Sequence, residues 1–176
     1  MTSPTHHGGP LDLTPETAPP QSLSEAGIHV ELTHSPLDIT TALARVRSPK
    51  AGALVLFAGT TRDNFDSKPV EHLSYTSYPP LALQTLLKIC REMKEKHSLI
   101  GISIIHRLGT CPVGEESILV AVSAPHRKAA WSAGEECLEI VKEKAEIWKL
   151  ETFVGGEGVW RANKDGVQDG STTAQV

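Results

Sequence analysis

The sequence has few cysteines, no early basic residues and no long apolar run. The three cysteines, Cys90, Cys111 and Cys137, lie far apart and form no Cys-x-x-Cys pair, so we predict neither a disulfide framework nor a zinc site. Because no Lys or Arg precedes Arg45, we expect neither a signal peptide with a basic start nor an Arg-rich transit peptide. No stretch approaches the roughly 18 apolar residues of a membrane span. These absences favour a reduced, cytosolic setting.

The cysteines are predicted to be structural rather than reactive. Cys90 and Cys137 fall within predicted helices and are expected to be small core residues. Cys111 lies in a Gly-Thr-Cys-Pro segment, which predicts an exposed loop thiol. No residue close to it in the sequence would lower its pKa, so we expect this thiol to be unreactive.

The composition predicts one globular domain between two tails. A hydrophobic fraction of 39% with 14 glycines in 176 residues is typical of a folded domain. Residues 1–26 are rich in proline, serine, threonine and glycine, and are predicted to be a disordered extension. Residues 162–176 are predicted to be a flexible tail, which leaves the domain at 27–161. Since the net charge is −4, an anionic ligand must meet a local cluster of cations, and we expect no binding to nucleic acid or membranes.

The hydrophobic pattern predicts an α+β fold. Alternating or continuous apolar runs predict strands at 28–33, 53–58, 70–78, 100–106, 117–123 and 148–154. Helical spacing predicts helices at 37–46, 79–97 and 126–145, the first with Ser35 as its N-cap. Runs of strands separated by single helices, with a hairpin between 100–106 and 117–123, predict a mixed, largely antiparallel sheet with two long helices and one short helix. The glycines at 155, 156 and 158 are predicted to form a turn.

Two lysines beside a predicted helix-to-strand turn are the first candidates for chemistry. Lys142 ends the helix and Lys149 follows Trp148 in the next strand. A partly desolvated ammonium can have its pKa lowered towards neutrality and then act as a proton carrier, a nucleophile or an anion clamp. Glu151 lies two residues beyond Lys149, on the same face of the strand, and could orient it.

Two further segments could hold an anion. The loop Thr60-Thr61-Arg62 follows a buried strand and offers hydroxyls, backbone N–H groups and a guanidinium. His126 and Arg127 stand at the predicted start of the long helix, where free N–H groups and the helix dipole favour an anion.

Each cluster also has a purely structural interpretation. Arg62 could pair with Asp63 or Asp66 at the surface. His126 could only cap its helix, with Arg127 in solvent, and Lys142 could belong to a solvated face with Glu139 and Glu146.

Residues from Gly52 to Trp160 resemble one known family. The matching segments, in chain order, are Gly52-Ala53, 57–62, 73–78, 106–109, 113–115, 123–127, Lys142 and 147–151. This order of motifs resembles the large, catalytic subunit of molybdopterin synthase. The resemblance implies an α/β-hammerhead-like fold and a sulfurtransferase without cofactor or metal. Its activity would be the conversion of cyclic pyranopterin monophosphate (precursor Z) into the dithiolene of molybdopterin.

The resemblance also implies partners. The sulfur would come from a small ubiquitin-like subunit that carries a C-terminal thiocarboxylate and threads its tail into this chain. A homodimer of large subunits with a small subunit at each end would form a heterotetramer. No cysteine of this chain need carry sulfur, in agreement with the absence of an activated thiol.

The family's site residues carry over to matching positions. The resemblance implies that the substrate is bound by Thr60, Thr61, Arg62, His126, Arg127, Lys142, Lys149, Leu150 and Glu151. Lys142 would be the principal catalytic residue, through proton transfer or stabilisation of the tetrahedral oxyanion. Lys149 would bind the partner's terminal carboxylate or the substrate, although the two lysine roles could be exchanged. These groups are expected to line one cationic pocket, with some of them shared across the dimer.

Two rival functions remain at this stage. One is a non-catalytic adaptor that grips a ubiquitin-like tail in a basic cleft. The other is a phosphate-ester hydrolase that uses His126 as acid or base, with Arg62 and Arg127 as clamps.

Overall fold

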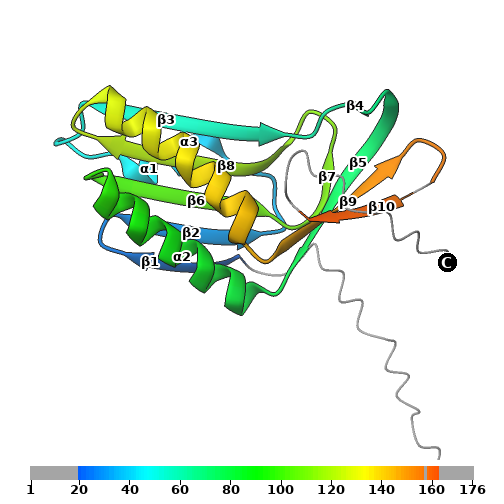
Figure 1. The fold of residues 1–176 in the computed structure, drawn as a ribbon, viewed down its shortest axis with the longest axis horizontal. Coiled ribbons are helices and arrows are strands. Elements are labelled where there is room, and N and C mark those ends of the chain that lie inside the picture. The colour runs from blue at the N-terminus through cyan, green and yellow to red at the C-terminus, as the bar shows by residue number, and fades with distance from the viewer. Residues whose placement is uncertain (1–19, 157, 163–176) are drawn as a thin grey trace, which may run out of the picture.

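The computed structural model describes residues 20–156 and 158–162, which form an α+β fold with two sheets (Figure 1). The strands are β1 (Gln21–Glu25), β2 (Ile28–Thr33), β3 (Ala53–Thr60), β4 (Asn64–Phe65), β5 (Lys68–Ser77), β6 (Gly101–Arg107), β7 (Gly109–Pro112), β8 (Glu116–Ala124), β9 (Ile147–Phe153) and β10 (Gly158–Ala162). The helices are α1 (Ile39–Val46), α2 (Pro79–Lys96) and α3 (Arg127–Lys144). The predicted α+β class with one short and two long helices is confirmed.

The strands divide between a larger helix-covered sheet and a smaller sheet at one end of it. The first sheet has the order β1-β2-β6-β8-β3, and the second has the order β10-β9-β5-β4, with β7 also paired to β5. Among the pairs in the described ranges, β2 and β6 run parallel and the others antiparallel, as the prediction of a mixed, largely antiparallel arrangement required. Figure 1 shows the second sheet projecting beyond the ends of β3 and β8.

Helices cover both faces of the first sheet. On β6, Ile104 packs into the cluster formed with α2 and α3, whereas its neighbour Ile105 packs with Ala42 and Val46 of α1. Successive strand residues point to opposite faces, so α1 must lie on the face opposite α2 and α3. This double cover explains why β6 and β8 are apolar runs rather than alternating strands.

The start of α1 differs from the prediction. Asp38, not Ser35, is the N-cap residue, and its carboxylate accepts hydrogen bonds from the backbone N–H groups of Thr40 (2.9 Å) and Thr41 (3.1 Å). An aspartate at this position satisfies two N–H groups that the helix leaves without an internal partner. The helix therefore begins at Ile39, two residues later than predicted.

The folded part begins earlier than the predicted boundary at residue 27. Gln21–Glu25 forms β1 and pairs with β2, and Leu23 packs against the core. The sequence of β1 has little apolar character. The strand is ordered because its backbone forms hydrogen bonds with β2. Residues 1–19 and 163–176, most of the two predicted tails, lie outside the described residues.

The predicted hairpin between β6 and β8 is present, but the segment between its strands is structured. β6 and β8 pair antiparallel, with Ile104 opposite Val120. Between them, β7 pairs with β5 and buries Cys111, which the sequence predicted to be exposed. Burial raises the pKa of the Cys111 thiol, and it raises that of Cys137 to about 12. A raised pKa disfavours the reactive thiolate, which agrees with the expectation of unreactive thiols, although for Cys111 the reason is burial.

Candidate active site

Lys149 and Glu151 form an ion pair on β9. The Lys149 Nζ lies 3.6 Å from Glu151 Oε1, and only 12% of the lysine side chain and 3% of the glutamate side chain are exposed. The predicted placement of both residues on one face of a strand is confirmed by this contact. A carboxylate this deeply buried requires a cation beside it, so each group holds the other in place.

The neighbouring strand provides an uncharged aromatic wall for this pair. Tyr75 of β5 stands opposite Lys149 in the strand register, and its ring packs edge-on against His106 with centroids 4.9 Å apart. His106 is fully buried, which lowers its pKa to about 4. Its Nδ1–H donates to the carbonyl of Arg107 at 2.8 Å. At neutral pH the ring carries no charge, so it adds no cation next to Lys149.

The low pKa of His106 predicts a loss of stability in acid. The unfolded chain binds a proton at this ring below its ordinary pKa of 6.5, while the folded protein does so only near pH 4. Stability from this group is therefore complete above pH 6.5 and falls by about 3 kcal/mol as the pH drops to 4. Urea unfolding at several pH values checks this. A His106→Gln variant should have a flatter pH profile, and identical slopes in both proteins would contradict the prediction.

Lys142 lies at the same end of the molecule as Lys149. It occupies the last turn of α3 and is half-buried. The chain then leaves the helix at Ala145 and enters β9 at Ile147, with one hydrogen bond from Ile147 N–H to the Ala145 carbonyl (2.8 Å). Glu146 turns towards α2, where its carboxylate accepts a hydrogen bond from Thr85 (3.1 Å). The tight connection thus brings the end of α3 next to the start of the strand that carries Lys149.

Thr60 ends β3, and the loop that continues through Thr61 and Arg62 has one buried anchor. Thr60 and Arg62 are exposed, whereas Thr61 is buried. The Thr61 hydroxyl donates to the carbonyl of Cys111 at 3.3 Å, and its backbone N–H donates to the carbonyl of Glu115 at 3.0 Å. The side chain of Thr61 is therefore used inside the protein, and the outer surface of the loop is formed by Thr60 and Arg62.

The strand register places this loop close to the lysine site. Cys111 of β7 and Glu151 of β9 both stand opposite Leu73, on the two sides of β5. Two strand spacings separate them by about 10 Å. The residue that anchors the Thr60–Arg62 loop and the strand that carries the Lys149–Glu151 pair therefore flank the same strand, β5.

His126 and Arg127 lie at the opposite end of the chain's fold. They follow β8 and begin α3, whereas Lys142 stands in the last turn of the same helix. At 1.5 Å per residue, the helix separates Arg127 from Lys142 by about 22 Å. Within one chain, His126 and Arg127 therefore do not reach Lys142, because the two residues and the lysine lie at opposite ends of α3. The expected common pocket stays a prediction, and it requires these two residues from a second copy.

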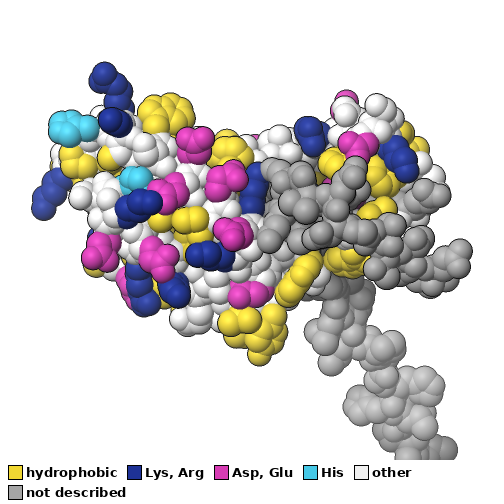
Figure 2. Space-filling view, viewed as in Figure 1, with side chains coloured by type: hydrophobic (Ala, Val, Ile, Leu, Met, Phe, Trp, Pro, Cys, Tyr) yellow, Lys and Arg dark blue, Asp and Glu magenta, His cyan; other side chains and the backbone are white. Residues whose placement is uncertain are grey.

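Both residues at the start of α3 are exposed. His126 is the N-cap residue, but its side chain makes no capping hydrogen bond. The adjoining turn between α1 and β3 is fixed by a hydrogen bond from Gly52 N–H to the carbonyl of Ala124 (3.1 Å). That turn carries further cations, and Figure 2 shows Lys and Arg side chains at this end of the molecule.

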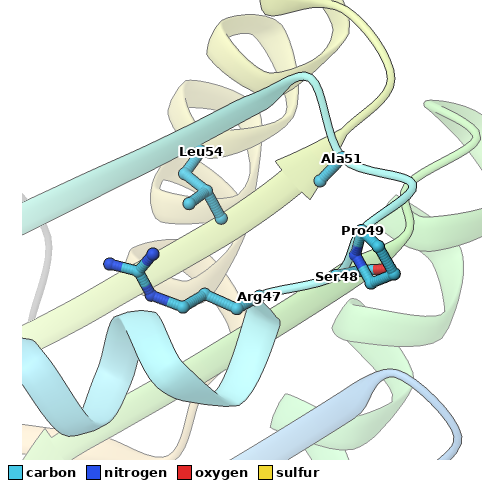
Figure 3. A pocket seen from close by; sticks show the side chains of 5 residues that line it. All are labelled: Arg47, Ser48, Pro49, Ala51 and Leu54. Carbon is cyan, nitrogen blue, oxygen red and sulfur yellow. The ribbon is translucent and has the colours of Figure 1, made fainter.

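Two hollows of the described surface have linings that include neither Lys142 nor Lys149. One lies between the end of α1 and the start of β3, and Figure 3 shows its lining of Arg47, Ser48, Pro49, Ala51 and Leu54. Another lies between α2 and α3 and includes Met93 and Ile140. Among residues 20–156 and 158–162, no group of three His, Cys, Asp or Glu side chains is arranged to hold a metal ion.

Sequence reasoning assigned no role to several residues that build the site. Tyr75, His106, Arg107 and Glu115 connect the two sheets around the candidate residues. In the sequence, the matching motifs at 106–109 and 113–115 could have pointed to these residues. Only the fold shows that the two motifs contact each other. No helix in the described ranges is long and apolar enough to cross a membrane.

Solved structures share this fold. The molybdopterin synthase of Staphylococcus aureus superposes with a TM-score of 0.70 at 34% identity, and covers 74% of this chain and 94% of that one. A complex of subunits 1 and 2 of the molybdopterin-converting factor from Helicobacter pylori gives a TM-score of 0.59 at 25% identity, with 69% and 83% covered. The chain therefore has the fold of molybdopterin synthase proteins.

Sequence comparison identifies the family. The family model described as MoaE protein matches residues 32–144. A Neurospora crassa protein named molybdopterin synthase catalytic subunit is 63% identical over 155 residues, covering 86% of this chain and 75% of the relative. A Phaeosphaeria nodorum protein with the same name is 66% identical over 139 residues, covering 79% and 74%. The chain belongs to the MoaE family, and the family resemblance stated from its motifs is confirmed.

Proposed function

We propose that this chain is the catalytic subunit of a molybdopterin synthase. It transfers sulfur from the thiocarboxylated C-terminus of a small ubiquitin-like subunit to precursor Z and forms the molybdopterin dithiolene. The observation that carries the proposal is that a half-buried Lys142 ends the helix that leads directly into β9, the strand with the Lys149–Glu151 ion pair, in a chain of this family. Three buried free thiols agree with a reaction in which the sulfur arrives on the partner.

Lys142 is the principal catalytic residue in this proposal. The thiocarboxylate sulfur takes the place of an oxygen substituent on the substrate carbon. Water then attacks the acyl carbon, and negative charge develops on the acyl oxygen of the tetrahedral intermediate. The acyl–sulfur bond breaks, so that the sulfur stays on the substrate and the partner's tail leaves as a carboxylate. An ammonium at the end of α3 can stabilise this oxyanion or deliver a proton to it. Lys142 is only half-buried, so part of its side chain is exposed to an incoming chain terminus.

Lys149 has a binding role beside it. Its Nζ is held by Glu151, so the position of the charge is fixed before a ligand arrives. A fixed cation loses little conformational freedom on binding a carboxylate or phosphate. We assign Lys149 and Glu151 to the face of β9 that receives the partner's tail and the substrate. Leu150 lies between them in the strand, and its side chain forms part of the opposite face.

Arg62 and Thr60 supply the other wall of the site. The guanidinium of Arg62 can hold the phosphate of precursor Z through two parallel hydrogen bonds. Thr61 keeps the loop in place from inside, through its contacts with Cys111 and Glu115.

A second copy of the chain completes the site in this proposal. His126 and Arg127 are cationic or polar, exposed and about 22 Å from Lys142 of their own chain. In a two-fold dimer each α3 N-terminus can lie against the site of the other copy, where its free N–H groups add to anion binding. Two large subunits with one small subunit at each end then form a heterotetramer, which we place in the cytosol.

Mixing two inactive variants tests the shared site. Lys142→Ala and Arg127→Ala chains should each be nearly inactive as homodimers. After dissociation and random reassociation, half of the dimers are mixed, and each mixed dimer has one site with both native residues. Activity should therefore recover to about a quarter of the wild-type value. No recovery, with mixed dimers confirmed by mass spectrometry, would show that His126 and Arg127 act within their own chain or not at all.

The central experiment is reconstitution of the reaction. The purified chain is incubated with the thiocarboxylated small subunit and precursor Z, and the dithiolene product is measured. The proposal requires product from the wild type and dependence on the thiocarboxylate. A hydrolase would instead release phosphate without a sulfur donor, and an adaptor would bind the small subunit without forming product. Either result would refute the proposed function.

A further inference from the structure

Arg107 stands where the two sheets meet, outside the set of residues assigned to the reaction. It is the last residue of β6 and is only 6% exposed. Its guanidinium forms an ion pair through Nη1 with Glu115 Oε2, in the turn between β7 and β8. The Glu115 side chain is 45% exposed, so the contact joins a buried arginine to a surface turn.

The ion pair with Glu115 is the charged contact on which the buried Arg107 side chain depends. Its Nε is buried and has no hydrogen-bond partner among the described residues. A buried guanidinium with one unsatisfied N–H depends strongly on the remaining charged contact. The arginine therefore holds the Glu115 side chain in one place, since moving it would leave the guanidinium without this carboxylate.

The backbone of the same turn holds the loop after β3. Thr61 N–H donates to the carbonyl of Glu115 (3.0 Å), and Gly114 N–H donates to the carbonyl of Thr61 (2.8 Å). These two hydrogen bonds continue the pairing of β3 with β8 past the irregularity at Gly59 and Thr60. The residue that follows Thr61 is Arg62, whose side chain is exposed.

We propose that Arg107 is a positioning residue for Arg62, acting through Glu115 and the backbone of Thr61. The inference rests on the proposed function, in which Arg62 binds the phosphate of the substrate. It assigns a role to the motifs at 106–109 and 113–115, which form a support for the anion-binding loop. The contact is made by one guanidinium nitrogen, Nη1, so the carboxylate of Glu115 is held at a single point.

Glu115→Ala is the variant that tests this role, because Glu115 is half-exposed and its removal leaves no cavity in the core. The KM for precursor Z should rise about tenfold, the loss expected for one charged hydrogen bond, with little change in kcat.

The rate of backbone amide exchange is the second measurement. In the Glu115→Ala variant it should become faster at Thr61 and Gly114. It should stay unchanged at Ile102, whose N–H donates to the carbonyl of Gly27, far from the turn. Glu115→Gln keeps an acceptor for Arg107 and should recover part of the KM. Glu116→Ala, at the neighbouring first position of β8, is the matched control.

A double-mutant cycle separates positioning from a general structural effect. If Glu115 acts through Arg62, Glu115→Ala should change the KM little in a protein that already carries Arg62→Ala. Full additivity of the two substitutions, or unchanged exchange at Thr61, would overturn the inference. If the wild type forms no dithiolene, the proposed function has failed, and the exchange measurement alone then decides whether Glu115 holds the loop.

Discussion

Replacing Lys142 with alanine should lower the rate of dithiolene formation by about 10²- to 10⁴-fold, the range for loss of a proton donor or an oxyanion partner. The loss should fall on kcat, because the charge that Lys142 stabilises develops only as water attacks the acyl carbon. Single-turnover measurement with the preformed thiocarboxylate complex checks this without interference from product release. A reduction of less than threefold would remove Lys142 from the chemistry.

The last turn of α3 offers a matched control. Lys144 is exposed and lies two residues after Lys142 in the same helix, so Lys144→Ala removes an equal charge without touching the proposed site. Its rate should stay within about twofold of the wild type. Lys142→Arg then distinguishes two roles, because arginine keeps the positive charge but does not release a proton near neutral pH. Recovery by arginine indicates electrostatic stabilisation, and no recovery indicates proton transfer.

Replacing Lys149 with alanine should destabilise the protein by about 3–5 kcal/mol, as expected when one member of a buried ion pair is removed. The cause is Glu151, whose carboxylate is almost fully buried and would lose the cation 3.6 Å away. Urea unfolding at pH 7 provides the measurement. The control is the double variant Lys149→Met with Glu151→Gln, which removes both charges and should recover most of the lost stability.

The same pair of variants separates binding from stability. If Lys149 binds the partner's terminal carboxylate or the substrate, the double variant should fold well but bind one of them weakly. Should Lys149→Ala cost less than 1 kcal/mol, the ion pair would not hold the site together, and the assignment of Glu151 as the residue that orients Lys149 would be withdrawn.

The measurements on the two lysines also separate the rival functions. A non-catalytic adaptor predicts that Lys142→Ala affects at most the affinity for the small subunit, because there is no reaction to slow. A phosphate-ester hydrolase predicts that His126 is needed within its own chain and that the lysines are dispensable. The distance between the two ends of α3 weakens the hydrolase, since the clamps Arg62 and Arg127 lie at opposite ends of β3 and β8.

The local elements could be predicted from sequence because they depend on local rules. Helical spacing located α2 and α3 within one or two residues, and the Lys149–Glu151 pair followed from the two-residue period of a strand. Local rules failed where the partner was remote. β1 forms a strand because it pairs with β2, and Cys111 is buried because β7 pairs with β5.

By itself, the sequence determined the fold class, the family and the identity of the candidate residues, because apolar periodicity and ordered motifs are written along the chain. Only the tertiary structure decided which of those residues meet. Strand register carries Thr61, Cys111, Leu73 and Glu151 to one end of the molecule, although they are far apart in sequence. The rigid length of α3 carries His126 and Arg127 to the other end, because a helix fixes the distance between its ends whatever its side chains could bind.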